Sequence, residues 1–170
     1  MAKVVLKLGD DISTDIIYPG RFMATVLPSE TPQFTFADIT DFNARLKIGE
    51  IPQGSVVVGG KNFGCGSSRE QAASCLKGSG LAVIARNYAR IFQQNSINLG
   101  LKLIICPDLQ ADEGDELDLT GNKVVNQTSG KSFETVPLPK SLQATLDAGG
   151  LIPYTRQRLL QRKTLVGMNK

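Results

Sequence analysis

The stretch GCGSSRE at residues 64–70 is the part of the sequence best suited to bind or transform an acidic ligand. Glycines allow backbone N–H groups to turn toward a ligand, and the N-terminus of a following helix favours negative charge. Arg69 can hold a carboxylate or a phosphate through two parallel hydrogen bonds. The same residues also suit an ordinary turn in which Ser67 or Ser68 caps the helix, so the residues alone leave both interpretations open.

The residue types exclude several kinds of site. The chain has no histidine, which excludes Ser-His-Asp triads, Cys-His pairs, histidine-containing zinc sites and histidine bases. Cys65, Cys75 and Cys106 form no Cys-x-x-Cys pair and no disulfide framework. Residues 64–70 also lack the glycine spacing of a dinucleotide fingerprint and the Gly-Lys-Ser/Thr of a P-loop.

Two other stretches carry clustered polar side chains. The loop predicted at residues 10–15 places three carboxylates close together, although aspartate is also a common turn residue and we identify no matching set of metal ligands nearby. The helix predicted at residues 86–99 carries Arg and Asn side chains after a buried strand. These side chains either lie at the carboxyl edge of the sheet, where ligands bind in open α/β sheets, or face solvent.

The elements that must position these residues alternate between residues 55 and 106. Short apolar runs predict buried strands, and the segments between them predict helices, the second of which ends at Gly100. The predicted strands are 55–59, 81–85 and 103–106, and the predicted helices are 71–77 and 86–99. A strand–helix–strand–helix–strand order is typical of a parallel α/β unit.

The flanking regions predict different structures. Before the α/β unit we expect a strand at 3–8, an irregular loop at 11–36 and a short helix at 36–46 capped by Thr35. After Asp108, the pattern predicts a small antiparallel β section followed by two helices. The strands are expected at 116–119, 123–125 and 132–136, and the helices at 139–147 and from Tyr154 onward. The predicted fold class is therefore mixed α/β.

Length and charge predict one domain with a basic tail. The 170 residues, of which 41% are hydrophobic, suit a single domain over 1–170. Residues 155–170 carry five Lys or Arg and no acid, so the rest of the chain has a net charge of −2 within a total of +3. Such a tail suits an acidic partner, nucleic acid or a solvated helix. Because stacked aromatic residues are missing, we expect no nucleic-acid partner.

We expect a cytoplasmic protein with no membrane partner. No apolar run approaches the roughly 18 residues that a membrane helix needs. The N-terminal sequence MAKVVLKLGDD also lacks the long apolar stretch of a signal peptide.

Four separated motifs resemble the swivelling domain of the aconitase superfamily. They are DISTDII at 11–17, GKNFGCGSSREQA at 60–72, YARIF at 88–92 with Asn95, Asn98 and Gly100, and DAGGL at 147–151. The resemblance implies a swivelling β/β/α fold with a mixed, barrel-like β core. It also implies a free-standing small subunit whose large partner subunit holds a [4Fe–4S] cluster, while this chain binds no cofactor or metal itself.

The resemblance further implies a hydro-lyase that dehydrates a small hydroxy-dicarboxylic acid and rehydrates the product the other way round. In such an enzyme the cluster would supply Lewis-acid chemistry at the hydroxyl group. Ser67 matches the base that removes a proton next to a carboxylate, and we expect nearby backbone N–H groups and Arg69 to provide the positive field that a serine base needs. Ser68 and Arg69 match contacts to the substrate carboxylate, and Asp15 matches an acidic group of the active site.

The loop after the first motif is expected to contact the variable part of the substrate. Homoaconitases resemble a Tyr-Leu-Arg-Thr pattern here, whereas this chain has Phe22, Met23, Ala24 and Thr25, preceded by Arg21. An extra carboxylate buried against Ala and Met would be costly, so an apolar substituent is favoured. We therefore expect isopropylmalate, a substrate of leucine biosynthesis. The alternatives are a homoaconitase substrate, a dimethylmalate, or a non-catalytic scaffold.

Overall fold

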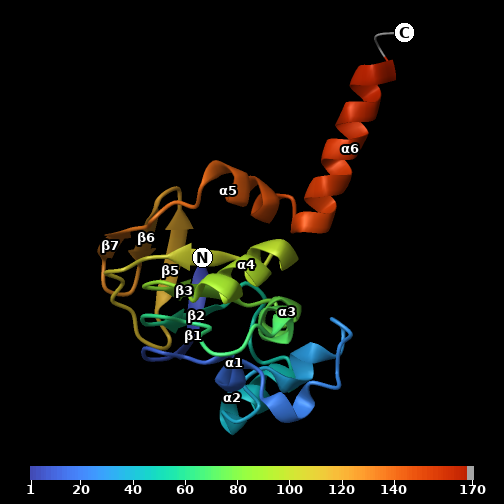
Figure 1. Cartoon of the computed structure of the whole chain (residues 1–170). Helices are drawn as coiled ribbons and strands as arrows, with labels where there is room; N and C mark the ends of the chain where they lie inside the picture. Colours follow the sequence, from blue (N-terminus) through green and yellow to red (C-terminus); the bar gives the residue numbers. More distant parts are fainter. Residues whose placement is uncertain (168–170) are drawn as a thin grey trace.

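The computed structural model describes the backbone of residues 1–167 and the side chains of residues 1–162. A curled seven-stranded sheet has the order β4-β3-β2-β1-β5-β6-β7 (Figure 1). Four of its strands are parallel: β1 (Ala2–Lys7), β2 (Val56–Gly59), β3 (Ala82–Ala85) and β4 (Leu103–Ile105). The other three continue the sheet antiparallel: β5 (Glu116–Thr120), β6 (Lys123–Asn126) and β7 (Lys131–Glu134). The predicted parallel unit followed by a β meander is confirmed.

The parallel strands are buried on both faces, which explains their continuous apolar sequence. All residues of β2 and β3 are buried. Successive side chains of a strand point to opposite faces, so Val56 and Val58 lie in one core cluster and Val57 in the other. Helices α3 (Glu70–Gly78) and α4 (Arg90–Leu99) cover one face, where Leu76 and Phe92 join the core cluster of Val57. These helices connect β2 to β3 and β3 to β4, as a parallel sheet requires.

The segment between β1 and β2 contains more local structure than the sequence predicted. It forms α1 (Thr14–Ile17), the 3-10 turns η1 (Gly20–Phe22) and η2 (Thr31–Phe34), and α2 (Thr40–Lys47). The helix predicted at 36–46 therefore begins four residues later, and the predicted cap is wrong. Ile39 is the N-cap, while the Thr35 hydroxyl lies 2.9 Å from that of Ser79, the C-cap residue of α3. A long-range partner has replaced the local one.

The C-terminal helices lie outside the sheet. Helix α5 (Lys140–Asp147) is followed by Gly149 and Gly150, and α6 (Leu151–Gly167) extends away from the body of the molecule (Figure 1). The expected helix from Tyr154 is thus part of a helix that begins at Leu151, and the last three residues of the predicted tail lie outside the described residues. In the described part of the chain, no helix has the length and apolarity that a membrane crossing needs.

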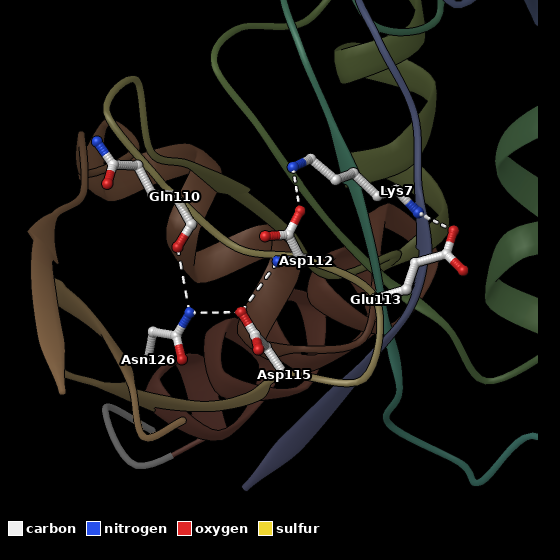
Figure 2. A network of polar contacts seen from close by, with 6 residues as sticks. All are labelled: Lys7, Gln110, Asp112, Glu113, Asp115 and Asn126. Atoms are coloured by element: carbon white, nitrogen blue, oxygen red, sulfur yellow. Dashed lines mark hydrogen bonds and ion pairs between the residues drawn. The ribbon is translucent and has the colours of Figure 1, made fainter. Parts of the chain in front are cut away.

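A network of polar contacts joins β1 to the loop before β5 and to the end of β6 (Figure 2). The buried Asn126 donates from its amide to the Asp115 carboxylate at 2.7 Å, and the same carboxylate oxygen accepts the backbone N–H of Asp112 at 2.9 Å. Lys7 pairs with the Asp112 carboxylate at 2.5 Å. The network therefore ties the parallel half of the sheet to the antiparallel half.

Candidate functional site: a serine beside an arginine–aspartate ion pair

The first two motifs of the sequence lie side by side in the fold. Ser13 and Cys65 form a parallel β-bridge. The backbone N–H of Thr14 donates to the Cys65 carbonyl at 2.8 Å, and that of Gly64 donates to the Ile12 carbonyl at 2.7 Å. These main-chain bonds bring the segment that contains Asp15 next to the segment that contains Ser67 and Ser68.

Ser67 lies on the molecular surface, while its backbone is held by the buried Thr14 side chain. Its N–H donates to the Thr14 hydroxyl at 3.1 Å, and the same hydroxyl donates to the Ser67 carbonyl oxygen at 3.3 Å. Asn95 of α4 donates from its amide to the Ser68 carbonyl at 3.1 Å. The Ser67 N–H therefore already has a partner, and the expectation that other nearby N–H groups and Arg69 provide the positive field stays a prediction.

The predicted serine cap of α3 is also wrong. Arg69 occupies the N-cap position, and no side chain caps this end of the helix. Ser67 lies two residues before the cap, so α3 begins too late in the sequence for its hydroxyl to bond the first helical N–H groups. Its hydroxyl therefore does not stabilise the helix, and Ser67 is exposed to solvent.

Arg69 forms an ion pair with Asp15, which follows Thr14 in α1. The Arg69 side chain is 16% exposed and the Asp15 side chain is 56% exposed. Gly20 lies against this pair, because a Cβ built on it would be 3.2 Å from Arg69 Nη2 and 3.3 Å from Asp15 Oδ1. The largely buried Arg69 thus lies two residues after Ser67 in the sequence. The exposed Asp15 lies on the neighbouring segment, which the bridge between Ser13 and Cys65 joins to the loop of Ser67.

In the predicted substrate loop, Arg21 and Phe22 have partners of their own. The Arg21 guanidinium bonds the Asp38 carboxylate and lies 4.6 Å from the centre of the Phe22 ring. This bonding raises the pKa of Arg21 and lowers that of Asp38. Phe22 stacks on Phe34 with ring centres 4.1 Å apart. Arg21 is therefore already paired and is not brought to the Arg69–Asp15 pair.

The remaining loop residues offer an apolar surface. Met23 is 43% exposed, Ala24 is exposed, and Thr25 is partly buried, with its N–H donated to the Phe22 carbonyl at 3.0 Å. Neither Met23 nor Ala24 carries a charge that could meet an additional carboxylate.

The third motif contributes more through tertiary contacts than through a helix face. Helix α4 begins at Arg90, four residues later than predicted. The Tyr88 hydroxyl lies 2.8 Å from the Val83 carbonyl and 2.9 Å from the Ile104 carbonyl, and its burial raises its pKa. Phe63 and Tyr88 form a further β-bridge. These contacts keep the residues before Arg90 out of the helix. They set the N-terminus of α4 beside residues 64–69, which carry Ser67 and Ser68 and are called the serine loop below.

The sequence analysis predicted no role for Thr14 or Asn95. Thr14 lies in the motif at 11–17, and Asn95 belongs to the motif that begins at Tyr88. The sequence signal for Thr14 was a threonine directly before the motif aspartate, but its burial and its bonding partner were evident only from the fold.

The cysteines of this chain do not fit an iron–sulfur cluster. Burial raises the pKa of the Cys75 thiol to about 12, and it also raises that of Cys106 to about 11. Cys75 and Cys106 lie in different core clusters, and Cys65 lies on the serine loop. Within residues 1–167, no three or more His, Cys, Asp or Glu side chains are grouped to hold a metal ion.

Comparison with known proteins identifies what the chain resembles. Residues 13–107 match the family model described as the aconitase C-terminal domain. The chain is 41% identical to the 3-isopropylmalate dehydratase small subunit of Methanosarcina mazei, covering 92% of this chain and 96% of that one. It is 43% identical to the isopropylmalate/citramalate isomerase small subunit of Methanocaldococcus jannaschii, with coverage of 92% and 94%.

A solved structure agrees with these sequence matches. The crystal structure of 3-isopropylmalate dehydratase from Methanocaldococcus jannaschii superposes with a TM-score of 0.86 at 37% identity. The match covers 95% of this chain and 96% of that one. The expected swivelling α/β fold is therefore confirmed.

Proposed function

The chain belongs to the aconitase C-terminal domain family, and from this membership we propose that it is the small subunit of 3-isopropylmalate dehydratase. The enzyme interconverts 2-isopropylmalate and 3-isopropylmalate by dehydration and rehydration, a step of leucine biosynthesis. As a small subunit, the chain works with a large subunit. We propose that the [4Fe–4S] cluster implied by the family resides in that large subunit.

One observation carries the assignment of roles within this chain. Ser67, Ser68 and Arg69 come from the loop before α3, which the bridge between Ser13 and Cys65 joins to the segment of Asp15, and Arg69 forms an ion pair with Asp15 itself. A polar constellation built from two distant segments supports a shared chemical role. Ser67 and Asp15 are also exposed, which suits a site that a second subunit completes.

In the proposed reaction Ser67 is the base. Its alkoxide removes the proton from the carbon next to a carboxylate as the hydroxyl leaves the neighbouring carbon, and it returns a proton when water adds in the opposite orientation. A serine hydroxyl is a very weak base in water, so it needs a positive neighbour that stabilises the alkoxide. Arg69 is two residues away and only 16% exposed, so its charge is less screened than that of a surface arginine.

The remaining residues orient the substrate. Ser68 and Arg69 hold its carboxylate, and Asp15 fixes the guanidinium through the ion pair, so that Arg69 offers its outer N–H groups in one orientation. Phe22, Met23, Ala24 and Thr25 face the variable substituent. Arg21, being paired with Asp38, supports this loop instead of binding a second carboxylate. This arrangement favours the apolar isopropyl group over a carboxylate-bearing substituent.

The deciding experiment is reconstitution with the large subunit from the same organism, after its cluster has been rebuilt without oxygen. The unsaturated intermediate is followed by ultraviolet absorbance with isopropylmalate, dimethylmalate, homocitrate-type acids and citrate. We expect turnover of isopropylmalate that Ser67→Ala abolishes and that Ser132→Ala, an exposed serine on β7, leaves unchanged.

Two results would overturn parts of this proposal. Preference for another acid would retain the mechanism and reassign the substrate. Absence of turnover with every acid, in a complex whose cluster is intact, would reject the enzyme assignment and favour a binding protein of the same fold.

A further inference from the structure

We propose that Thr14 is the positioning residue of the Ser67 base. A single buried hydroxyl holds both polar groups of the Ser67 main chain: it accepts the N–H at 3.1 Å and donates to the carbonyl oxygen at 3.3 Å. A hydroxyl has one donor and two acceptor positions, so it can make both bonds at once. This inference rests on the proposed role of Ser67 and names the group that keeps it in place.

The loop that carries Ser67 needs such an anchor. Gly64 and Gly66, on the N-terminal side of Ser67, have φ values of +79° and +91°. Glycine reaches this region easily, but it also leaves the unfixed backbone many alternative conformations. Two hydrogen bonds, one on each side of the Ser67 Cα, fix the direction in which its side chain leaves the backbone.

Thr14 is itself held rigidly. The residue is only 1% exposed, and its N–H donates to the Cys65 carbonyl at 2.8 Å. Its carbonyl accepts the N–H of Tyr18, the C-cap residue of α1, at 2.9 Å, and Ser13 caps the start of that helix through its hydroxyl. A β-branched side chain on a fixed backbone has few rotamers, so the hydroxyl stays aimed at the serine loop.

Thr14 also connects the two halves of the site. Asp15, the next residue, is the ion-pair partner of Arg69. The same short helix α1 therefore sets the base through Thr14 and the carboxylate-binding cation through Asp15. Displacement of either contact changes the geometry between Ser67 and Arg69, and a misplacement of about 1 Å can cost roughly 100-fold in rate.

The first test uses the isolated chain and does not depend on enzyme activity. Hydrogen exchange of backbone amides, followed by NMR, should show the Ser67 N–H exchanging more slowly than the Ser68 N–H in the unmodified chain. Thr14→Val, which keeps the shape and removes the hydroxyl, should speed exchange at Ser67 by about 10-fold or more, because opening then breaks no hydrogen bond there. Thr14→Ser should restore the protection.

The matched control is Thr145→Val. Thr145 is also buried, and its hydroxyl bonds the Ser141 carbonyl at 3.0 Å within α5, away from the serine loop. It should leave the Ser67 amide unchanged. Equal exchange rates at Ser67 and Ser68 in the unmodified chain would overturn the proposal, even if Thr14→Val failed to fold.

The second test measures kcat and KM in the reconstituted complex. Thr14→Val should lower kcat about 100-fold with KM changed less than threefold, since the bound substrate still meets Arg69 while the base is displaced. Thr14→Ser should recover most of kcat, and Thr145→Val should match the unmodified enzyme. An unchanged kcat in a folded Thr14→Val complex would overturn the inference, whereas full activity of Ser67→Ala would instead overturn the proposed function.

Discussion

Arg69 and Asp15 are 54 residues apart in the sequence and form an ion pair beside Ser67. One partner is the N-cap residue of α3 and the other lies in the first turn of α1. Gly20 lies against both, so three segments meet at one guanidinium. The pair determines how the cation of the candidate site is presented to a substrate.

Arg69→Lys should lower kcat/KM for isopropylmalate by roughly 10- to 100-fold, as expected for the loss of about 1.5–3 kcal/mol of charged hydrogen bonding. Lysine keeps the charge but cannot bond Asp15 and a substrate carboxylate through a planar fork. The comparison is Arg45→Lys, which alters another arginine ion pair, with Glu50, at the surface. Equal kcat/KM values for the two variants would contradict the role of Arg69.

Gly20→Ala should raise KM severalfold with little effect on folding stability. The added methyl would lie 3.2 Å from Arg69 Nη2 and 3.3 Å from Asp15 Oδ1, so the ion pair has to shift by a few tenths of an ångström. Gly9→Ala is the control, because its Cβ would have no atom within 4 Å. Steady-state kinetics and thermal unfolding of both variants check this prediction, which fails if the two behave alike.

Ala24→Arg should shift substrate preference toward an acid with an additional carboxylate. Ala24 is exposed, and the nearby Arg21 is already paired with Asp38, so a new cation there would supply the missing charge partner. The ratio of kcat/KM for a homocitrate-type acid to that for isopropylmalate should rise at least about 10-fold, equivalent to roughly 1.4 kcal/mol. Ser29→Arg adds the same charge further along the loop, and an equal shift in that variant would argue against a specific site.

Asp115 should make folding stability depend on pH in the acidic range. The hydrogen bond from the Asp112 N–H and then the one from Asn126 hold the pKa of Asp115 below its usual range (Figure 2). A carboxylate with a lowered folded-state pKa stabilises the fold above its unfolded pKa of about 3.9. This contribution is lost as the pH falls through the lower folded value.

Urea unfolding between pH 6 and pH 2.5 measures this effect. Asp115→Asn should lose less stability on acidification than the unmodified chain, although it is less stable at neutral pH. Asp108→Asn also removes one exposed negative charge and corrects for the change in net charge. Equal slopes against pH for Asp115→Asn and the unmodified chain would show that the network in Figure 2 does not carry the dependence.

The two ends of α4 differ in how well the sequence predicts them. Gly100 ends α4 as predicted, because its φ of +79° is a conformation that glycine adopts at no steric cost. The helix begins four residues later than predicted. The residues before Arg90 are held outside it because Tyr88 forms a β-bridge with Phe63 and its hydroxyl bonds the Val83 carbonyl. Local patterns identify a helix, while long-range partners decide where it begins.

The parallel strands, the helices between them and the motif that contains Ser67 and Arg69 could be predicted from the sequence alone. These follow from runs of apolar residues and from glycine positions, which act over a few neighbouring residues. The folded structure was needed to show that the Thr14 hydroxyl holds the Ser67 main chain, that Asp15 forms an ion pair with Arg69, and that Arg21 turns to Asp38. Each of these contacts joins residues 17 or more positions apart in the sequence, so its partner depends on how the chain packs, which no local pattern encodes.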